Sequence, residues 1–279
     1  MKKIFMMVLS VLMVFMLCAT VCGEMVSTVN VYVSISDKGT SVINFEKIEV
    51  SDVDNDSAVT INDVLITAHQ KFFDGESGYG FAETEYGVSI TKLWGDTSGS
   101  YGYYKNNASA WSLADNVSEG DYVYAFVYSD TETWSDTYSY FNANETLVSL
   151  GEEFGLELYM AGYDENWNPI TELVSGATIL IDGQKTEIKT DENGKANIKI
   201  DSVGTHTISA MSDALTLVPP ICLVEVSVVE DSKSETESTE NEKPSTPNTG
   251  DVSDCSVWYI ACVLAAFVMF GISKRVHEK

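Results

Sequence analysis

A short acidic segment in the first quarter of the chain has the residue types and the spacing that could hold a metal ion. Asp52, Asp54, Asp56 and Asp63 place carboxylates at its first, third, fifth and twelfth positions. Ala58, at the seventh position, could add its backbone carbonyl oxygen. This spacing wraps oxygen atoms around one point, and Ca²⁺ takes about six to eight oxygen ligands. The segment therefore predicts a calcium site.

The acidic segment resembles the calcium loop of EF-hands, in the form with Asp at the twelfth position that dockerin domains use. Ser57 stands at the sixth position, where such loops favour glycine because the backbone turns left-handed. We therefore expect weak affinity, which millimolar extracellular calcium would satisfy. An alternative is a solvated acidic turn with Asp63 near a helix N-terminus. Dockerins carry two such loops, so docking to a cohesin is not expected.

A second candidate site is the stretch rich in Trp and Tyr between Trp94 and Tyr140. One strand face cannot bury so many indole and phenol groups without hydrogen-bond partners. One interpretation is a face that binds sugars or flat ring systems. Its candidate contacts are Trp94, Tyr103, Tyr104, Asn106 and Trp111. The alternative is ordinary packing in the core and at the edges of a β-rich domain.

Catalytic patterns are weak in this sequence. His69 and His206 fall in different predicted domains, and neither forms a recognisable pattern with a Ser or a Cys. We find no zinc-ligand spacing, phosphate-binding loop or dinucleotide fingerprint. The prediction is a protein that is not an enzyme.

The overall charge excludes one class of partner. The chain has 279 residues, with 42 acidic against 16 basic residues and a formal net charge of -26. Such a balance is incompatible with nucleic-acid binding through phosphate neutralisation. Because 44% of the residues are hydrophobic, the chain is expected to fold and not to be a disordered acidic tail.

The N-terminal residues 1–23 have the order of a secretory signal peptide. Lys2 and Lys3 precede an apolar run from Ile4 to Leu17, and small residues follow up to Gly23. Four of the five cysteines lie in this segment or near the C-terminus, which leaves Cys222. We expect Cys222 to be a buried, inert thiol, and the domains to be held by their cores without disulfides.

The C-terminal part combines a polar linker (230–249), an apolar run (257–272) and a basic tail (274–275). At the end of the linker stands the pentapeptide Thr246, Pro247, Asn248, Thr249 and Gly250. This order resembles the cell-wall sorting signal of Gram-positive sortase substrates, whose pentapeptide is Leu-Pro-x-Thr-Gly, with Thr in place of Leu. The resemblance implies that a sortase attacks the carbonyl of the second threonine, releases the glycine side and joins the protein to peptidoglycan.

Residues 257–272 would then span the membrane before processing, as part of a sorting segment that covers 250–279. The resemblance therefore implies an exported protein at the cell wall, with sortase and peptidoglycan as partners. The alternative is a C-terminal membrane anchor that is not cleaved.

Residues 24–142 predict an α+β domain of the β-grasp type. Two strands precede a helix over 62–73, and further strands follow it. Tyr103 to Asn107 and the Gly120-Asp121 turn resemble the transcobalamin-like C-terminal β-grasp family of bacterial surface proteins. The resemblance implies the fold. It leaves the ligand open among a carbohydrate, a corrinoid and a protein.

Residues 143–229 predict an all-β sandwich similar to the immunoglobulin-like (Ig-like) modules of bacterial surface proteins. Leu156, Leu158 and Met160 alternate with polar residues, and Asp182-Gly183 is a hairpin signal. Such modules usually act as spacers. The expected function is therefore a non-enzymatic binding protein on the cell surface, with the first domain as ligand module. The alternative is a purely structural surface protein whose first domain binds no small ligand.

Overall fold

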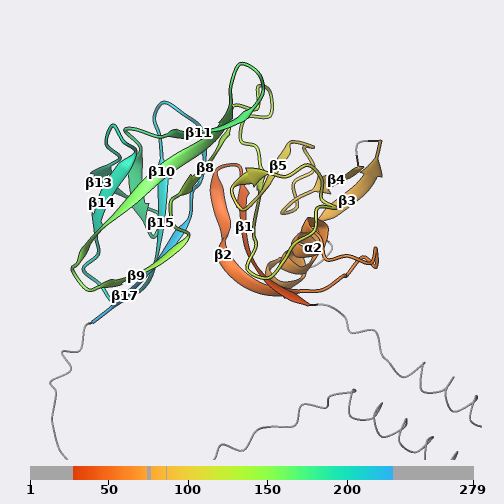
Figure 1. The fold of residues 1–279 in the computed structure, drawn as a ribbon, viewed down its shortest axis with the longest axis horizontal. Helices are drawn as coiled ribbons and strands as arrows, with labels where there is room; N and C mark the ends of the chain where they lie inside the picture. The colour runs from red at the N-terminus through yellow and green to blue at the C-terminus, as the bar shows by residue number, and fades with distance from the viewer. Residues whose placement is uncertain (1–27, 74–76, 86, 229–279) are drawn as a thin grey trace, which may run out of the picture. The chain divides into compact units, whose positions relative to one another are not determined.

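The computed structural model describes residues 28–73, 77–85 and 87–228, drawn in colour in Figure 1. The predicted signal peptide, linker, sorting pentapeptide and apolar run 257–272 lie outside these residues. The described secondary structure is mostly β, with one short helix, α2 (Ile61–Phe72), and several sheets. Within this part of the chain, no helix is long and apolar enough to cross a membrane.

The first part of the chain forms one five-stranded sheet. Its strands, in spatial order, are β2 (Thr40–Val50), β1 (Val29–Asp37), β7 (Tyr122–Val127), β5 (Tyr101–Lys105) and β6 (Ala108–Ser109). β1 pairs antiparallel with β2 and parallel with β7, and β5 pairs antiparallel with β7. A separate hairpin joins β3 (Gly80–Thr84) to β4 (Gly87–Lys92). The predicted order of two strands, a helix and further strands is confirmed, although β3 was not predicted.

Helix α2 packs on one face of this sheet. Its N-cap is Thr60, whose side chain accepts from the backbone N–H of Asp63 while the Asp63 side chain accepts from the Thr60 N–H. This reciprocal pair satisfies two donors that a helix start otherwise leaves unpaired. Ile61, Val64 and Leu65 are fully buried in the core between helix and sheet.

β7 is the central strand, and all six of its residues are buried. Its alternate apolar residues Val123, Ala125 and Val127 join the core beneath α2. On the opposite face, its aromatic residues join a second cluster, which we call the aromatic junction. This cluster also contains residues from the second half of the chain, so the described residues fall within one compact unit. The buried members of the aromatic junction are Phe45, Tyr122, Tyr124, Phe126, Tyr138, Val218 and Ile221.

The second part of the chain is built from two sheets. One contains, in spatial order, β11 (Pro169–Leu173), β10 (Glu153–Tyr163), β8 (Thr137–Phe141) and β16 (Leu217–Val218), and β14 (Lys195–Lys199) also pairs with β10. The other contains β13 (Gln184–Lys189), β12 (Thr178–Ile181), β15 (Gly204–Met211), β17 (Cys222–Ser227) and β9 (Glu145–Ser149). Apolar side chains from both sheets form one core.

The burial of Cys222 and the position of β8 can be compared with the predictions from the sequence. Cys222 is buried, as expected, and burial raises the pKa of its thiol to about 12. The predicted boundary between 142 and 143 placed β8 with the first domain. In the structure, β8 pairs with β10 and β16, and therefore belongs to the second group of strands.

Candidate functional site

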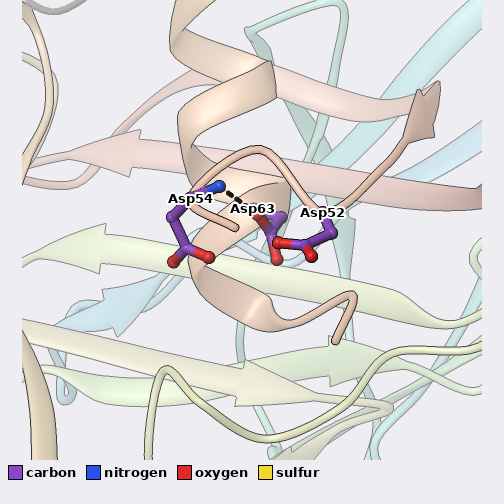
Figure 2. Close-up of side chains that lie close together, drawn as sticks. All are labelled: Asp52, Asp54 and Asp63. Carbon is purple, nitrogen blue, oxygen red and sulfur yellow. Dashed lines mark hydrogen bonds between the residues drawn. The ribbon is translucent and has the colours of Figure 1, made fainter. Parts of the chain in front are cut away.

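The acidic segment forms a loop between β2 and α2 in which three carboxylates converge. Asp52, Asp54 and Asp63 each offer one oxygen, and these atoms lie within 4.8 Å of one another. Figure 2 shows the three side chains gathered at the start of the helix. Asp63 is fully buried, whereas Asp52 and Asp54 are half-buried. This cluster could bind a metal ion.

The backbone of the loop turns around its own carboxylates. Asp52 accepts hydrogen bonds from the backbone N–H groups of Asp56 (3.1 Å) and Ser57 (2.9 Å). Asp54 accepts a second bond from Asp56 N–H, and Asp56 accepts one from Ala58 N–H. Ser57 has φ 76°, so the sixth position does adopt the left-handed conformation that the spacing requires.

Asp63 has more hydrogen bonds than a simple closing ligand would need. One of its oxygens accepts from the N–H groups of Val53 (2.7 Å) and Asp54 (3.3 Å), the latter drawn as a dashed line in Figure 2. The other accepts from the N–H and the hydroxyl of Thr60, both at 2.9 Å. Four donors fill about four lone-pair positions. A cation that is to bind Asp63 must therefore displace one donor, and the bond from Asp54 is the longest.

The pKa of the Asp56 carboxyl is raised above its usual value by its surroundings in the loop. Partial desolvation raises the pKa of this carboxyl first, and the nearby charges of Asp54, Asp63 and Asp52 raise it further. The hydrogen bond from Ala58 N–H acts in the opposite direction. A divalent cation among these groups would relieve the repulsion.

The acidic loop adjoins a cavity of about 440 Å³ that the sequence did not reveal. Asn62 links the two, because its amide donates to Asp54 (2.7 Å) and accepts from the Tyr79 hydroxyl (2.8 Å). The lining residues are Val53, Asp54, Ile66, His69, Gln70, Tyr79, Gly80 and Phe81.

His69 is a packing residue of this region. Its Nδ1 lies 2.6 Å from the Leu65 carbonyl oxygen, so it donates there, and its Nε2 accepts from Trp94 N–H at 3.1 Å. Only 1% of the residue is exposed, and burial lowers the pKa of the imidazole to about 4. The ring is therefore neutral at pH 7 and packs against the helix.

The five predicted ligand contacts do not share one face. Tyr103 and Tyr104 are consecutive in β5, so their side chains point to opposite faces of the sheet. Tyr103 packs on the core beneath α2, as does Trp94. Tyr104 stacks on Tyr138 in the aromatic junction, with ring centroids 3.8 Å apart.

The remaining two predicted contacts lie in turns. Asn106 holds a turn, since its amide donates to Asp121 and accepts from Tyr122 N–H, both at 2.8 Å. Trp111 is 94% exposed. Packing thus accounts for most of the aromatic stretch, but not for the exposed residues Trp111 and Trp134.

The structure also brings together three groups that the sequence analysis did not connect. Asp182 lies 2.7 Å from His206 Nδ1, and the Ser202 hydroxyl lies 3.2 Å from His206 Nε2. The same Nε2 lies 3.1 Å from the Ser202 carbonyl oxygen, and Asp182 also accepts from Thr207 N–H. The ring therefore ties a turn to a hairpin, and we assign it a structural role.

Comparisons with known proteins give no family. No protein-family model and no curated protein matches the chain. A solved structure of the N-terminal four Ig domains of Dscam1 isoform 9.44 (with zinc) is 12% identical, with a TM-score of 0.19 over 54% of this chain and 36% of that chain. The same domains of isoform 4.4 are 8% identical, with a TM-score of 0.21 over 74% and 45%. This chain thus spans less than half of either relative, and at these TM-scores the likeness carries no functional argument.

Proposed function

We propose that this chain is a non-enzymatic protein displayed on a Gram-positive cell wall, in which a calcium-stabilised β-grasp domain is joined to an Ig-like sandwich. The observation that carries the proposal is the convergence of Asp52, Asp54 and Asp63 in a loop that turns around its own carboxylates. Calcium is abundant outside cells, and the ends of the sequence have the order of export and sorting signals.

The strand connections support the two domain types. In the first part, the outer pairs β1–β2 and β5–β7 flank a central parallel pair, β1–β7, and one helix packs on the sheet. This is the arrangement of a β-grasp and agrees with the resemblance to the transcobalamin-like family. In the second part, β8 and β9 are consecutive but enter opposite sheets, and β9 pairs in parallel with β17. β8 and β9 can be regarded as two halves of one first strand, each paired in a different sheet. This arrangement supports an Ig-like sandwich.

The calcium proposal is tested by thermal unfolding of the purified full chain in calcium, in magnesium and in chelator. A ligand that binds only the folded state stabilises it by about 2.7 kcal/mol at a hundredfold excess over Kd. We expect calcium to raise the Tm and magnesium to raise it much less. Asp54→Ala combined with Asp56→Ala should abolish the difference.

Asp191→Ala provides a matched control for the calcium experiment. This carboxylate also folds a turn, through bonds from the N–H groups of Asn193 and Lys195, but it lies in the second part of the chain. The control should lower the Tm while it leaves the calcium effect unchanged. Identical wild-type melting curves in calcium and in chelator would contradict the proposal and favour the solvated acidic turn.

The display proposal is tested by Thr249→Ala in the full chain. The variant should not remain on peptidoglycan that has been boiled in detergent. The sortase attacks the carbonyl of the motif threonine, and this threonine is absent from the variant. Asn248→Ala is the matched control, since the corresponding position of the resembling signal is variable. Retention of Thr249→Ala on extracted peptidoglycan would show that the sorting interpretation is wrong and would leave the uncleaved anchor as the alternative.

A purely structural role for the first domain is the second candidate, and one observation favours it. The aromatic face of β7 is covered by Tyr138, Val218 and Ile221 of the second part, and is therefore not available to a ligand. A binding role must depend on other surfaces of the described residues.

A further inference from the structure

Two exposed tryptophans stand on loops of closely similar construction. Trp134, between β7 and β8, is 63% exposed, and Trp167, between β10 and β11, is 81% exposed. Both have left-handed backbones, with φ 52° and 63°. A bulky side chain in this conformation is an outlier that Gly or Asn would adopt with less strain. Neither packing nor turn geometry therefore explains why tryptophan stands at these positions.

Each loop is fixed by an aspartate that precedes the tryptophan. The Asp130 carbonyl accepts from Trp134 N–H, and its carboxylate accepts from the N–H groups of Glu132 and Thr133 and from the hydroxyls of Thr133 and Ser135.

In the second loop, the Asp164 carbonyl accepts from Trp167 N–H, and its carboxylate accepts from the N–H groups of Asn166 and Asn168 and from the Asn168 amide. Both indoles are thus held out by preorganised backbone, which lowers the entropy lost when a ligand binds.

Two tyrosines, Tyr128 and Tyr163, link the loops: the pKa of Tyr128 is raised first by burial and further by nearby groups that include Tyr163. Trp134 donates its indole N–H to the Ser100 hydroxyl at 3.4 Å, and the Ser100 carbonyl accepts from Tyr128 N–H. Tyr128 and Ala161 both pack on the aromatic junction.

Tyr163 lies two residues after Ala161 in β10 and therefore points to the same face. Its ring centroid is 6.1 Å from that of Trp167. Successive contacts thus link Trp134, through Ser100, to Tyr128, and then to Tyr163 and Trp167. We call the four partly exposed aromatic residues, Tyr128, Trp134, Tyr163 and Trp167, the tryptophan patch.

The charges around the tryptophan patch restrict what it can bind. The loop sequences 129–136 and 164–168 contain five acidic residues and no Lys or Arg, so polyanions are repelled. The carboxylates of Asp130, Asp136 and Asp164 are engaged by donors within the loops, whereas the exposed Glu132 and Glu165 could meet a cationic partner, which the polylysine titration below tests. What remains is flat aromatic surface beside hydroxyl and amide groups, and this combination suits an uncharged sugar.

We propose that the tryptophan patch binds an uncharged polysaccharide, whose pyranose rings stack on Trp134 and Trp167. The proposal deepens the surface-protein function above and rests on it for the location where such a ligand is met. It replaces the predicted face around Trp94 and Tyr104, because these half-buried residues pack on opposite sides of the sheet.

The test is calorimetric titration of the purified full chain, in a detergent without a sugar headgroup, with maltoheptaose, cellohexaose and chitohexaose. At least one should bind with Kd below about 1 mM. Trp134→Asn and Trp167→Asn should each weaken binding about tenfold, because each removes one stacking surface. Asn tolerates the left-handed backbone, so the loops should keep their fold, and an unchanged Tm verifies this.

Trp111→Asn is the matched control, because Trp111 is also exposed, at 94%, but no contact joins it to the patch among the described residues. It should leave binding unchanged, and Trp167→Tyr should restore most of the affinity. The proposal is overturned if none of the three sugars binds, if Trp111→Asn weakens binding as much as the patch variants, or if polylysine binds and the sugars do not. Peptidoglycan attachment is measured separately, so its loss and the loss of sugar binding are distinguishable.

Discussion

Asp63 fixes the junction between β2 and α2 through four hydrogen bonds. It caps the helix through Thr60 and holds the loop through Val53 and Asp54. The charge that could attract calcium is therefore the same charge that orders the loop. Its contribution to stability should be separable from that of the other acids.

We predict that Asp63→Asn destabilises the chain by about 3 kcal/mol even in chelator, because the buried amide nitrogen cannot accept and leaves donors unpaired. Asp52→Asn should cost less than about 1 kcal/mol in chelator, because its donors lie in the exposed part of the loop. Urea unfolding with and without calcium measures both. Equal losses for the two variants in chelator would contradict the assigned role of Asp63.

His69 predicts a pH dependence with a definite sign. The pKa of the imidazole is lowered from 6.5 to about 4 in the folded chain, first by burial. The unfolded state therefore binds the proton first, and the contribution of His69 to stability is complete above about pH 6.5 and is lost as the pH falls toward 4. The loss amounts to about 3 kcal/mol.

The measurement is urea unfolding of wild type and His69→Gln between pH 4 and pH 7. Gln can keep a donor toward Leu65 and an acceptor toward Trp94 but does not titrate. The stability of the wild type should fall more steeply than that of the variant as the pH drops. Parallel curves would show that the buried ring does not contribute.

At the scale of elements, Gly102 of β5 packs closely against the Phe126 ring of β7. Gly102 and Phe126 are cross-strand partners, and a Cβ on Gly102 would lie 2.2 Å from the Phe126 ring. The glycine is required because the ring covers it on the face of the aromatic junction.

We predict that Gly102→Ala destabilises the chain by about 1–3 kcal/mol through overpacking. In a Phe126→Ala background the same change should be neutral, because the space is then open. A double-mutant cycle by urea unfolding measures the coupling. Additive effects would contradict a steric origin.

Local patterns predicted the elements better than their contacts. Tyr122, Tyr124 and Phe126 alternate with apolar residues, a pattern typical of a strand with one aromatic face, but Val218 and Ile221, which cover that face, stand about ninety residues later. No local pattern encodes such a contact. β3 was missed because four of its five residues are exposed, so it has no buried alternation that would predict a strand.

The candidate sites show the same limit. The spacing from Asp52 to Asp63 predicted that acids would converge, and Asp52, Asp54 and Asp63 do so, because these residues are local in the sequence. The fourth predicted acid, Asp56, is not part of this cluster. The spacing did not show that Asp63 is already saturated with donors. Trp134 and Trp167 were not singled out as contacts, because their exposure and their contacts with Ser100 and Tyr163 depend on the tertiary structure. The Asp residue that precedes each of them within four positions was the available signal.

At the scale of the whole molecule, the aromatic junction makes the two parts depend on each other. The Tyr124 hydroxyl donates to the Pro219 carbonyl at 2.6 Å, and the Tyr138 hydroxyl donates to Asn107 at 2.8 Å. These bonds and the shared cluster cross from the first part to the second. A change in one part should therefore be felt in the other.

We predict that the described residues unfold in one transition, and that calcium slows hydrogen exchange in β12 and β15 as well as in α2. Tyr138→Ala should remove the effect on β12 and β15 while it leaves the effect on α2, because it empties the centre of the aromatic junction. Hydrogen exchange followed by mass spectrometry measures both. Calcium protection confined to the first part of the wild type would show that the junction does not couple the parts.

The parallel pairing of β9 with β17 acquires a mechanical meaning in a chain that is tethered to a wall. Tension from the wall would reach the sandwich at Ser227, and the opposing pull would come from the first part. The pull from the first part enters at β8, so it would load β9 at Glu145 once β8 has separated from β10 and β16. In the parallel pair of β9 and β17, Glu145 and Ser227 lie at opposite ends, so the load then runs along these strands. The ladder, in register from Leu223 with Glu145 to Ser227 with Ser149, would then have to shear as a whole and could not open bond by bond. β17, the last strand of the described fold, would thus be the strand whose pairing with β9 resists mechanical unfolding.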